Sequence, residues 1–484
     1  MTSENRPFYI TTPIFYPNGK LHIGHAYAAS MCDIFARMAR MVGRPTYFLT
    51  GADENSLKVQ RMADLEGKEV IAFLDEQAAI SQHLFGQLHI SYDQYIRTTD
   101  PDAHHQGVIE MWNRLEKAGD IYEGSYEGYY CVGCESFKTE KDLIHGCCPI
   151  HETPAELLKE KNYFFRLSKY RDRIKKAIES DELLVRPEAR KNEILAVLEE
   201  GLEDISFSRP YHGQKNAILV PNDPTQAIYV WGDALVNYIS ALGFGTMVDE
   251  TFKTFWPEAI HLIGKDILRF HAAIWPGMLL SAGISLPKKI LVTGLMQSGG
   301  KKMSKSLGNV IDPYEMIELV GAEGLRFFFA HDVPLLDDGE ITKDLIVASY
   351  NAHLANGIGN LTNRLLKMMI SYDVQFDPMT ITNNTYWQEV HEKVGEYLEN
   401  NDVTGYANYL WQGFASIDVW IQETEPFKLF KTDPEKAKKI VGEMMVKFYI
   451  LASFAQPILP DNVPEIIKHI ETRQMPERPL FDKI

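Results

Sequence analysis

The sequence has little of several things, and each shortage excludes a class of protein. Only 5 of its 484 residues are cysteine, too few for the dense disulfide framework of a small secreted domain. No apolar run approaches the length that a membrane-spanning helix requires. Residues 1–6 lack the apolar core of a secretory signal, so we expect a cytoplasmic protein without membrane association.

Positive charge is also scarce. There are 49 Lys and Arg residues against 66 Asp and Glu, which gives a formal net charge of −17 at pH 7. This balance argues against broad binding of nucleic acid, although a local basic surface can still dock a phosphate backbone. With 45% hydrophobic and 24% charged residues, the composition is that of a large globular enzyme of about two to four domains.

The first informative segment is His22–His25, with the sequence His-Ile-Gly-His. A β-branched and aromatic run at 8–12 predicts a buried strand, and apolar residues recur with helical spacing from His25 to a stop at Gly43. The segment therefore lies where a strand gives way to a helix, a position that favours phosphate, and Gly24 permits close approach of a ligand. We predict that both imidazoles donate hydrogen bonds to phosphate; two ordinary surface histidines are the alternative.

The second informative segment is the loop 302–306, Lys-Met-Ser-Lys-Ser. A predicted strand at 288–294 precedes it, and Gly299-Gly300 is expected to act as a flexible hinge. Lys302 and Lys305 would place two ammonium groups where negative charge builds on a leaving pyrophosphate. A solvated basic turn is the alternative. Two such segments, each at the end of a predicted strand, favour one shared triphosphate site.

Together the two segments resemble the signature motifs of the class I aminoacyl-tRNA synthetases, and most of all those of the methionyl-tRNA synthetases. Residues 11–19 are similar to that family's opening strand and turn, and 229–238 and 263–271 are similar to its later segments. The resemblance extends over nearly the whole chain. It implies activation of L-methionine by ATP, with Mg²⁺ accompanying the ATP, and transfer from methionyl-adenylate to the 3′-terminal adenosine of methionine tRNA.

The order of predicted elements favours an α/β protein with a Rossmann-like, doubly wound parallel sheet that is split by a zinc-binding connective insertion and followed by an α-helical bundle. Helical spacing predicts the last helices at 351–372, 386–399, 406–422 and 434–454. With the resemblance, we expect five parts: first half of the catalytic domain (1–117), insertion (118–215), second half with the lysine loop (216–309), stem-contact joint (310–345) and anticodon-binding bundle (346–484).

The resemblance assigns two sets of ligand-binding residues. The set expected to bind ATP is His22, Gly24, His25, Gly264, Asp266, Lys302, Ser304 and Lys305, of which His22, His25, Lys302 and Lys305 are the catalytic set. The set expected to bind methionine is Ile14, Tyr16, Asp53, Trp231, Ala234, Leu235, Tyr238, Ile267 and His271, with Asp53 on the ammonium group. Such a pocket separates substrates that differ by one methylene by only ~1–3 kcal/mol, so homocysteine should also enter.

Four cysteines are clustered, and their spacing is typical of a metal site rather than of disulfides. Cys131-x-x-Cys134 and Cys148-x-x-His151 form two knuckles, and three thiolates with one imidazole make a closed tetrahedral zinc site. We predict one structural Zn²⁺ per chain on these four residues. Two alternatives stay open: an all-cysteine site that also uses Cys147, and a set of reduced thiols without metal.

The chain departs from the family pattern at three positions. Asn55 stands where the family commonly has His, Gly232 where a bulkier aliphatic residue is usual, and Phe427 where a Trp stacks on the anticodon. Phe427 keeps an aromatic face, so we expect it to bind the anticodon together with Asn356 and Arg364.

These departures leave a second function open: a synthetase paralogue that activates an amino acid or binds RNA without charging methionine tRNA. The intact histidine and lysine segments argue against a pure binding module. Other class I synthetases share both segments, but the branched-chain enzymes carry a long editing insertion for which 484 residues leave no room. The cysteine enzyme places its metal in the substrate pocket. The chain ends without the appended tRNA-binding domain of some relatives, and we expect a monomer.

Overall fold

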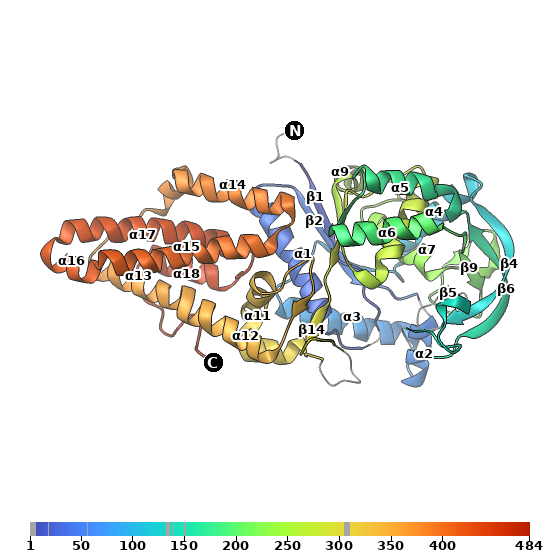
Figure 1. Cartoon of the computed structure of the whole chain (residues 1–484), viewed down its shortest axis with the longest axis horizontal. Coiled ribbons are helices and arrows are strands. Elements are labelled where there is room, and N and C mark those ends of the chain that lie inside the picture. Colours follow the sequence, from blue (N-terminus) through green and yellow to red (C-terminus); the bar gives the residue numbers. More distant parts are fainter. Residues whose placement is uncertain are drawn as a thin grey trace.

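A six-stranded parallel sheet lies at the centre of the molecule, in the order β3-β2-β1-β12-β13-β7 (Figure 1). The computed structural model describes residues 6–17, 19–55, 57–131, 136–138, 140–149, 152–303 and 310–484. The strands of this sheet are β1 (Phe8–Thr11), β2 (Thr46–Ala52), β3 (Gln94–Arg97), β7 (Leu184–Arg186), β12 (Ala259–Gly264) and β13 (Lys289–Thr293). Strand order reverses between β1 and β12, which is where a Rossmann-like sheet binds its ligand.

Helices cover the sheet, as a parallel sheet requires. After β1, α1 (Ile23–Met41) buries its apolar side, and Gly43 follows it with φ +78°. The predicted first strand and the helix with its glycine stop are therefore confirmed. The other elements of the first half are α2 (Leu57–Leu65), α3 (Val70–Gln87), η2 (Pro101–His105) and α4 (Gln106–Lys117). The second half adds α7 (Val230–Ala234), α8 (Asn237–Ser240), α9 (Glu250–Phe255), η5 (Trp256–Glu258), η6 (Lys265–Ile267), η7 (Phe270–Ile274) and α10 (Trp275–Ser281).

Two antiparallel sheets form the end of the molecule opposite the bundle (Figure 1). One has the order β5-β4-β6-β8, and its strands are β4 (Ile121–Cys131), β5 (Ser136–Lys138), β6 (Glu156–Phe165) and β8 (Ile205–Ser206). The other has the order β10-β11-β9, with β9 (Ser208–Pro210), β10 (Leu219–Val220) and β11 (Asp223–Ile228). Along the chain, the strands of the first sheet are separated by η3 (Glu140–Asp142), η4 (Leu167–Tyr170), α5 (Arg171–Glu179) and α6 (Glu188–Glu200).

Two details differ from the expected arrangement of the insertion. β7 lies within 118–215, yet it pairs in parallel with β13, with Val185 opposite Ile290, and so belongs to the central sheet. Its three residues are too few for a strand periodicity to be recognised. The expected second half, 216–309, also does not begin with a strand of the central sheet, because residues 219–228 join the second antiparallel sheet and the central sheet resumes only at β12.

The expected joint at 310–345 is mostly one helix. α11 (Pro313–His331) begins with an ordinary cap, since the Asp312 carboxylate accepts the N–H of Tyr314 at 2.8 Å and Pro313 occupies the first turn. Residue Gly321, with φ +73°, kinks this helix. A small sheet in the order β15-β14-β16 links the lysine segment to the joint, and its strands are β14 (Met296–Ser298), β15 (Lys301–Lys302) and β16 (Gly339–Glu340).

The rest of the chain is a helical bundle that extends away from the sheet (Figure 1). Its elements are α12 (Lys343–Ser349), η9 (Tyr350–Gly359), α13 (Asn360–Ser371), η10 (Pro378–Asn383), α14 (Thr385–Asn400), α15 (Val403–Thr424), α16 (Pro426–Thr432), α17 (Pro434–Ala455) and α18 (Asn462–Thr472). The α/β class with a Rossmann-like sheet and a C-terminal helical region is confirmed. In the part of the chain that the structure describes, no helix combines the length and apolar character needed to cross a membrane.

A buried ion pair ties this bundle to the sheet. Arg326 of α11 is fully buried and contacts Asp33 of α1 at 2.7 Å. Its guanidinium also donates to the carbonyls of Leu88, Pro457 and Ile458, at 2.9, 2.6 and 3.2 Å. Burial alone would raise the pKa of Asp33, but the Arg326 and Arg37 guanidiniums outweigh it and hold that pKa below its ordinary value.

Candidate active site

His22 and His25 build the N-terminal cap of α1. Nδ1 of His22 accepts the N–H of Gly24 at 3.1 Å, and Nδ1 of His25 accepts the N–H of His22 at 3.1 Å. The two rings stack with their centroids 3.7 Å apart. Because both Nδ1 atoms accept, each ring proton resides on Nε2, which is a hydrogen-bond donor suited to a phosphate oxygen.

Two further features hold this cap neutral and compact. Burial, and to a lesser extent the neighbouring His22, lowers the pKa of His25 to about 3. A Cβ atom at position 24 would lie 2.9 Å from Cε1 of His22, so only glycine lets that ring fold over the first turn. The sequence His-Ile-Gly-His therefore encodes a reciprocal cap made of imidazoles, in place of the hydroxyl and carboxylate of an ordinary capping box.

A cavity of about 620 Å³ opens beside this cap, at the carboxyl ends of β1, β12 and β13. Met303 of the lysine loop and Val310, four residues beyond its end, line the same cavity as His22 and His25. The two informative segments thus face one cavity although nearly 280 residues separate them along the chain (303 − 25 = 278). This is the convergence on which the prediction of a shared triphosphate site depended.

The cavity collects most of the residues predicted to bind ATP. His22, Gly24, His25, Gly264 and Asp266 all line it. Ser304 and Lys305 lie outside the described residues, as does the side chain of Lys302. The roles of all eight residues stay predictions.

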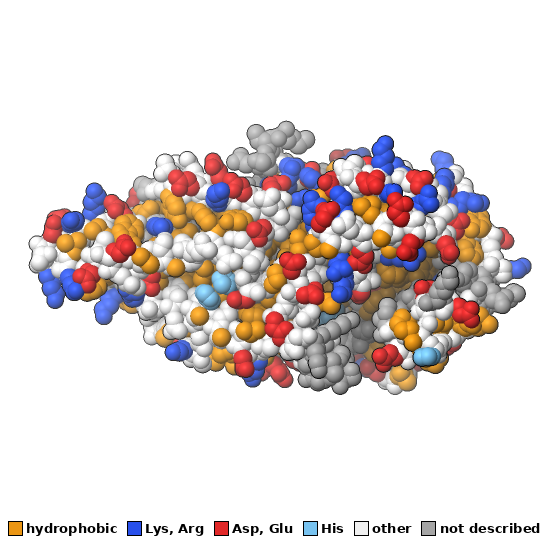
Figure 2. Space-filling model, viewed as in Figure 1, with side chains coloured by type: hydrophobic (Ala, Val, Ile, Leu, Met, Phe, Trp, Pro, Cys, Tyr) orange, Lys and Arg blue, Asp and Glu red, His pale blue; other side chains and the backbone are white. Residues whose placement is uncertain are grey.

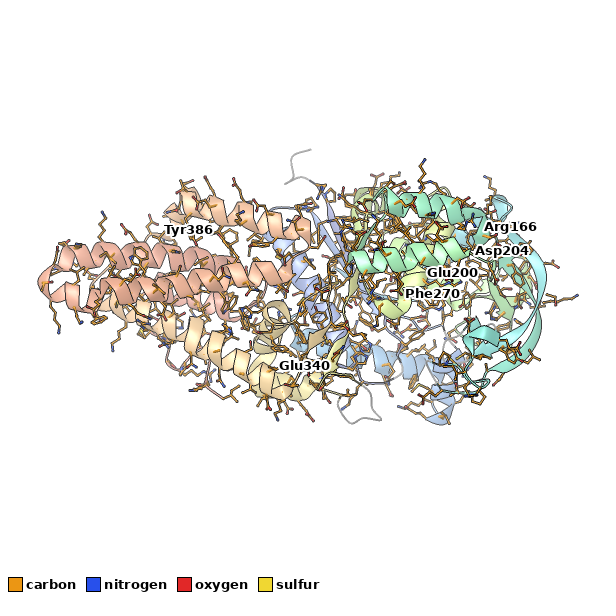
Figure 3. All side chains as sticks on the ribbon, viewed as in Figure 1. Arg166, Glu200, Asp204, Phe270, Glu340 and Tyr386 are labelled. Atoms are coloured by element: carbon orange, nitrogen blue, oxygen red, sulfur yellow. The ribbon has the colours of Figure 1, made fainter. Side chains whose placement is uncertain are left out.

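All nine residues predicted to bind methionine line the cavity: Ile14, Tyr16, Asp53, Trp231, Ala234, Leu235, Tyr238, Ile267 and His271. The ring of Trp231 stacks on Phe270, with centroids 3.7 Å apart and an angle of 13° between the planes; Phe270 is labelled in Figure 3. Asp53 is only 3% exposed. An aromatic wall and a buried carboxylate in one pocket suit an apolar side chain joined to an ammonium group.

Tyr238 and His271 form a hydrogen-bonded pair in this pocket. The Tyr238 hydroxyl and Nε2 of His271 lie 2.7 Å apart, and Nδ1 of His271 lies 2.9 Å from the carbonyl of Ile267. A carbonyl can only accept, so Nδ1 carries the proton and the Tyr238 hydroxyl donates to Nε2. Burial lowers the pKa of His271 to about 4 and thus keeps the imidazole neutral. This pair presents polar atoms without net charge.

A buried network supports the pocket from behind. The Asn55 side chain donates to Asp233 at 2.7 Å and to the carbonyl of Thr98 at 3.0 Å. The other Asp233 carboxylate oxygen lies 2.5 Å from Nε2 of His104. The loop that carries Asp53 is thereby tied to α7, which carries Trp231 and Ala234. Asn55, a departure from the family pattern, joins this network through its side-chain NH2 group.

The second departure is also accommodated. A Cβ atom at Gly232 would lie 2.7 Å from Cζ of Phe207, so the ring of Phe207 occupies the space that a larger residue at 232 would need. A residue from the insertion therefore packs against α7, the helix that carries Trp231 and Ala234 of the pocket.

Sequence reasoning missed several residues that line the cavity. Lys20 and Lys265 add cations beside the predicted ATP residues, and Tyr27 and Asn237 complete the wall. Both lysines lie within two positions of a predicted site residue, and that adjacency was the signal available for them. The contact of Phe270 with Trp231 had no such signal, because it joins segments nearly forty residues apart (270 − 231 = 39).

The predicted zinc ligands are described in part. Cys131 and Cys148 are 1% and 0% exposed, whereas Cys134 and His151 lie outside the described residues. Around Cys148 the chain turns sharply, with the N–H of Glu152 donating to the Cys148 carbonyl at 2.7 Å and the N–H of Cys148 donating to the Thr153 carbonyl at 2.9 Å. Among the described residues, no three His, Cys, Asp or Glu side chains lie close enough together to hold a metal ion.

The predicted anticodon residues lie on the bundle. Phe427 is 49% exposed on α16, at the end remote from the sheet (Figure 1). Asn356 is exposed on η9, and Arg364 of α13 pairs with Asp418 of α15. Their role in binding RNA stays a prediction.

Comparison with known proteins agrees with this site. The family model "tRNA synthetases class I (M)" matches residues 8–155 and 138–366. The methionine–tRNA ligase of Caldanaerobacter subterraneus subsp. tengcongensis is 37% identical in an alignment of 480 positions, which covers 96% of this chain and 74% of that protein. The enzyme of Bacillus subtilis is 39% identical in an alignment of 494 positions including gaps, which covers 97% of this chain and 74% of that protein.

A solved structure shows the same likeness in three dimensions. Mycobacterium tuberculosis methionyl-tRNA synthetase in complex with methionyl-adenylate superimposes with a TM-score of 0.89 at 34% identity, covering 97% of this chain and 94% of that one. The apo form of the same enzyme gives a TM-score of 0.84. With a family model over most of its length and relatives matched almost end to end, this chain belongs to the methionyl-tRNA synthetases of class I.

Proposed function

We propose that this chain is a methionine–tRNA ligase, which activates L-methionine with ATP and transfers the methionyl group to the 3′-terminal adenosine of methionine tRNA. One observation carries the proposal. A single cavity is lined by the histidine cap, by Met303 and Val310 at the lysine loop, and by all nine residues predicted to bind methionine. A phosphate-binding end and an aromatic, carboxylate-bearing end in one cavity are what the joining of an amino acid to a nucleotide requires.

The chemistry needs no side-chain nucleophile, because the methionine carboxylate itself attacks the α-phosphate of ATP. The protein holds the reactants in line and absorbs the charge that develops on pyrophosphate. The Nε2–H groups of His22 and His25 donate to phosphate oxygens, and Asp266 takes the ribose hydroxyls beside Gly264. Lys302 and Lys305 neutralise the leaving pyrophosphate, and Mg²⁺ bound with the ATP adds positive charge there.

Methionine is recognised at the other end of the cavity. Trp231, stacked on Phe270, offers an aromatic face to the thioether, and the neutral Tyr238–His271 pair lies in the same pocket. The buried Asp53 carboxylate pairs with the ammonium group. Homocysteine differs from methionine only in lacking the methyl group on sulfur, so it is expected to enter with a penalty of only ~1–3 kcal/mol.

Cys131, Cys134, Cys148 and His151 would hold one Zn²⁺ in the insertion. The two buried thiols and the sharp turn at 148–153 fit such a site, because a knuckle turn presents closely spaced ligands. Zinc there supplies a cross-link between two loops, with no part in the reaction. Metal analysis of the purified protein should give one Zn²⁺ per chain, and a value well below one would contradict the site.

The bundle would bind the anticodon, and the joint at 310–345 the acceptor stem. Although the chain is acidic, exposed lysines gather near Phe427 on α16 and the start of α17, namely Lys428, Lys431, Lys436 and Lys439. Figure 2 shows Lys and Arg side chains at this end of the bundle. Cations beside an exposed aromatic ring suit an unstacked base on a phosphate backbone. We place the enzyme in the cytoplasm as a monomer.

Two assays test the proposal. Exchange of pyrophosphate into ATP should depend on methionine, with homocysteine as a weaker substrate; exchange driven by leucine or cysteine instead would contradict it. A methionine tRNA transcript should then accept methionine. Full activation without transfer would favour the alternative, a paralogue that acts on another acceptor.

A further inference from the structure

The glycine pair before the lysine loop forms a tight turn. Gly299 and Gly300 have φ of +66° and +68°, and the flanking strands β14 and β15 pair with Ser298 opposite Lys301. Positive φ at both central residues is the pattern of a two-residue type I′ hairpin turn. The glycine pair, expected to be flexible, thus has a defined hairpin geometry in this structure, and its flexibility stays a prediction. The hairpin itself gives no strand partner to the N–H groups of its two central residues.

A carboxylate from another segment takes both of these N–H groups. Oε1 of Glu340 accepts from Gly299 at 2.5 Å, and Oε2 accepts from Gly300 at 3.2 Å. Glu340 is an exposed residue of β16, which lies beside β14 with Gln297 opposite Glu340; it is labelled in Figure 3. Hydrogen bonds from two adjacent amides to one carboxylate are charge-assisted and fix the orientation of the turn.

The same segment holds the base of the hairpin. Oδ1 of Asp338 accepts the N–H of Leu295 at 2.8 Å, and Oδ2 accepts from the side chain of Gln297 at 3.2 Å. The backbone of the two segments is also bonded: the N–H of Gly339 donates to the carbonyl of Leu295 at 3.0 Å, and the N–H of Ile341 donates to that of Gln297 at 2.9 Å. The segment 338–341 is thus bonded to the hairpin along its length, and Glu340 is its contact with the tip.

We propose that Glu340 is a positioning residue for adenylate formation. Its carboxylate fixes the turn from which the lysine loop leaves, so that the ammonium groups of that loop reach the pyrophosphate as it departs. The proposal rests on the proposed function. Charge stabilisation of this kind depends on placement, and a displacement of about 1 Å can cost as much as 100-fold in rate.

This role differs in its signature from a general contribution to stability. The residues predicted to bind methionine lie on other elements, so loss of Glu340 should leave the KM for methionine unchanged. Transfer of methionine from preformed adenylate to tRNA occurs after pyrophosphate has left, so it should also be unchanged. Only the kcat of adenylate formation, measured as pyrophosphate exchange, should fall.

The test compares Glu340→Ala and Glu340→Gln with Glu116→Gln. Glu116 is an exposed carboxylate of α4, so the control removes one charge from the protein without touching the hairpin, the cavity or the joint. We expect kcat of exchange to fall about tenfold for Glu340→Ala. A smaller fall is expected for Glu340→Gln, whose amide oxygen can still accept one N–H. Melting temperatures of all three variants, and the rate of single-turnover transfer, should stay at the wild-type values.

Hydrogen–deuterium exchange of the peptide 295–303 gives a readout that does not need activity. The amides of Gly299 and Gly300 should exchange faster in Glu340→Ala than in Glu116→Gln. Unchanged amide exchange in Glu340→Ala would overturn the proposal. So would a kcat of pyrophosphate exchange within twofold of wild type, or a loss in the transfer step equal to the loss in pyrophosphate exchange. If the wild type itself shows no methionine-dependent exchange of pyrophosphate, the proposed function fails, and the amide exchange still decides the role of Glu340.

Discussion

The histidine cap and the lysine hairpin face the same cavity, but they are held in opposite ways. Nδ1 of His22 and of His25 accept from backbone amides within three residues, so the cap is a local structure of α1. The hairpin turn at Gly299-Gly300 is held by Glu340, about forty residues further along the chain (340 − 300 = 40). One of the two elements is thus preset by its own helix. The other depends on a neighbouring segment that leads directly into the bundle.

This difference teaches where each element can be disturbed. The cap should change only when its own residues change, and it should do so in an all-or-none manner. The hairpin should respond in graded fashion to changes at a distance, including changes in the segment 338–341 that joins it to α12. The following predictions test that contrast, from the largest expected effect to the smallest.

Substitution of the cap histidines should have the largest effect. Both His22→Ala and His22→Asn should reduce pyrophosphate exchange about 100- to 1,000-fold, because each removes a hydrogen-bond donor to developing charge. Asn is a good N-cap residue, so His22→Asn should keep the melting temperature, whereas His22→Ala should cost about 1 kcal/mol of stability. Full activity in His22→Asn would show that the imidazole serves only as a cap.

Two glycine substitutions compare the local and the remote element directly. Gly24→Ala would place a methyl group 2.9 Å from His22, so the ring must leave the cap, and exchange should fall nearly as far as in His22→Ala. Gly300→Ala meets no atom within 4 Å, but its φ is +68°. We expect about 1 kcal/mol of strain in the hairpin and a loss of less than tenfold. Steady-state exchange and melting temperature measure both variants. Equal losses would remove the contrast.

Removal of the Tyr238 hydroxyl should affect methionine alone. Tyr238→Phe deletes the hydrogen bond to Nε2 of His271 and leaves a buried acceptor unpaired, which costs about 1–3 kcal/mol. If that pair orients methionine, the KM for methionine should rise roughly tenfold while the KM for ATP stays constant. Equal changes in both KM values would indicate a distortion of the whole cavity.

Stability should depend on pH through buried neutral histidines. Burial lowers the pKa of His271 to about 4 from an ordinary value of 6.5, and burial lowers that of His261 well below 6.5. The unfolded chain therefore binds more protons than the folded protein between these values. The contribution of these histidines to the free energy of unfolding should be fully present above pH 6.5. It should fall by up to about 1.4 kcal/mol per pH unit per histidine as the pH decreases towards 4.

Urea unfolding at pH 7.0 and at pH 5.5 measures this dependence, and His271→Gln should flatten the slope. An unchanged slope in that variant would mean that His271 is protonated in the folded state. Pyrophosphate exchange between pH 6 and 8 should show no titration of His25, whose pKa of about 3 keeps it neutral throughout.

Much of the fold and of the site could be predicted because its signals are local. The first strand, α1 and the glycine after it follow from residue types within one segment, and so do the helices of the bundle. The resemblance assigned nine residues to the binding of methionine, and all nine line one cavity. Prediction failed where a structure depends on a distant partner. β7 is three residues long and exists because β13 pairs with it, and the turn at Gly299-Gly300 is bonded to Glu340, which no pattern near the glycines indicates.

The sequence by itself determined the histidine cap, since its donors, acceptors and the required glycine all lie within four residues, where backbone geometry alone brings them together. It also determined which chemical groups the protein has available for a triphosphate and a thioether. Only the tertiary structure decided that these groups meet, that Phe207 fills the space beside Gly232, and that Asn55 joins Asp233 and His104. Contacts between distant segments depend on how the whole core packs, and no short stretch of sequence contains that information.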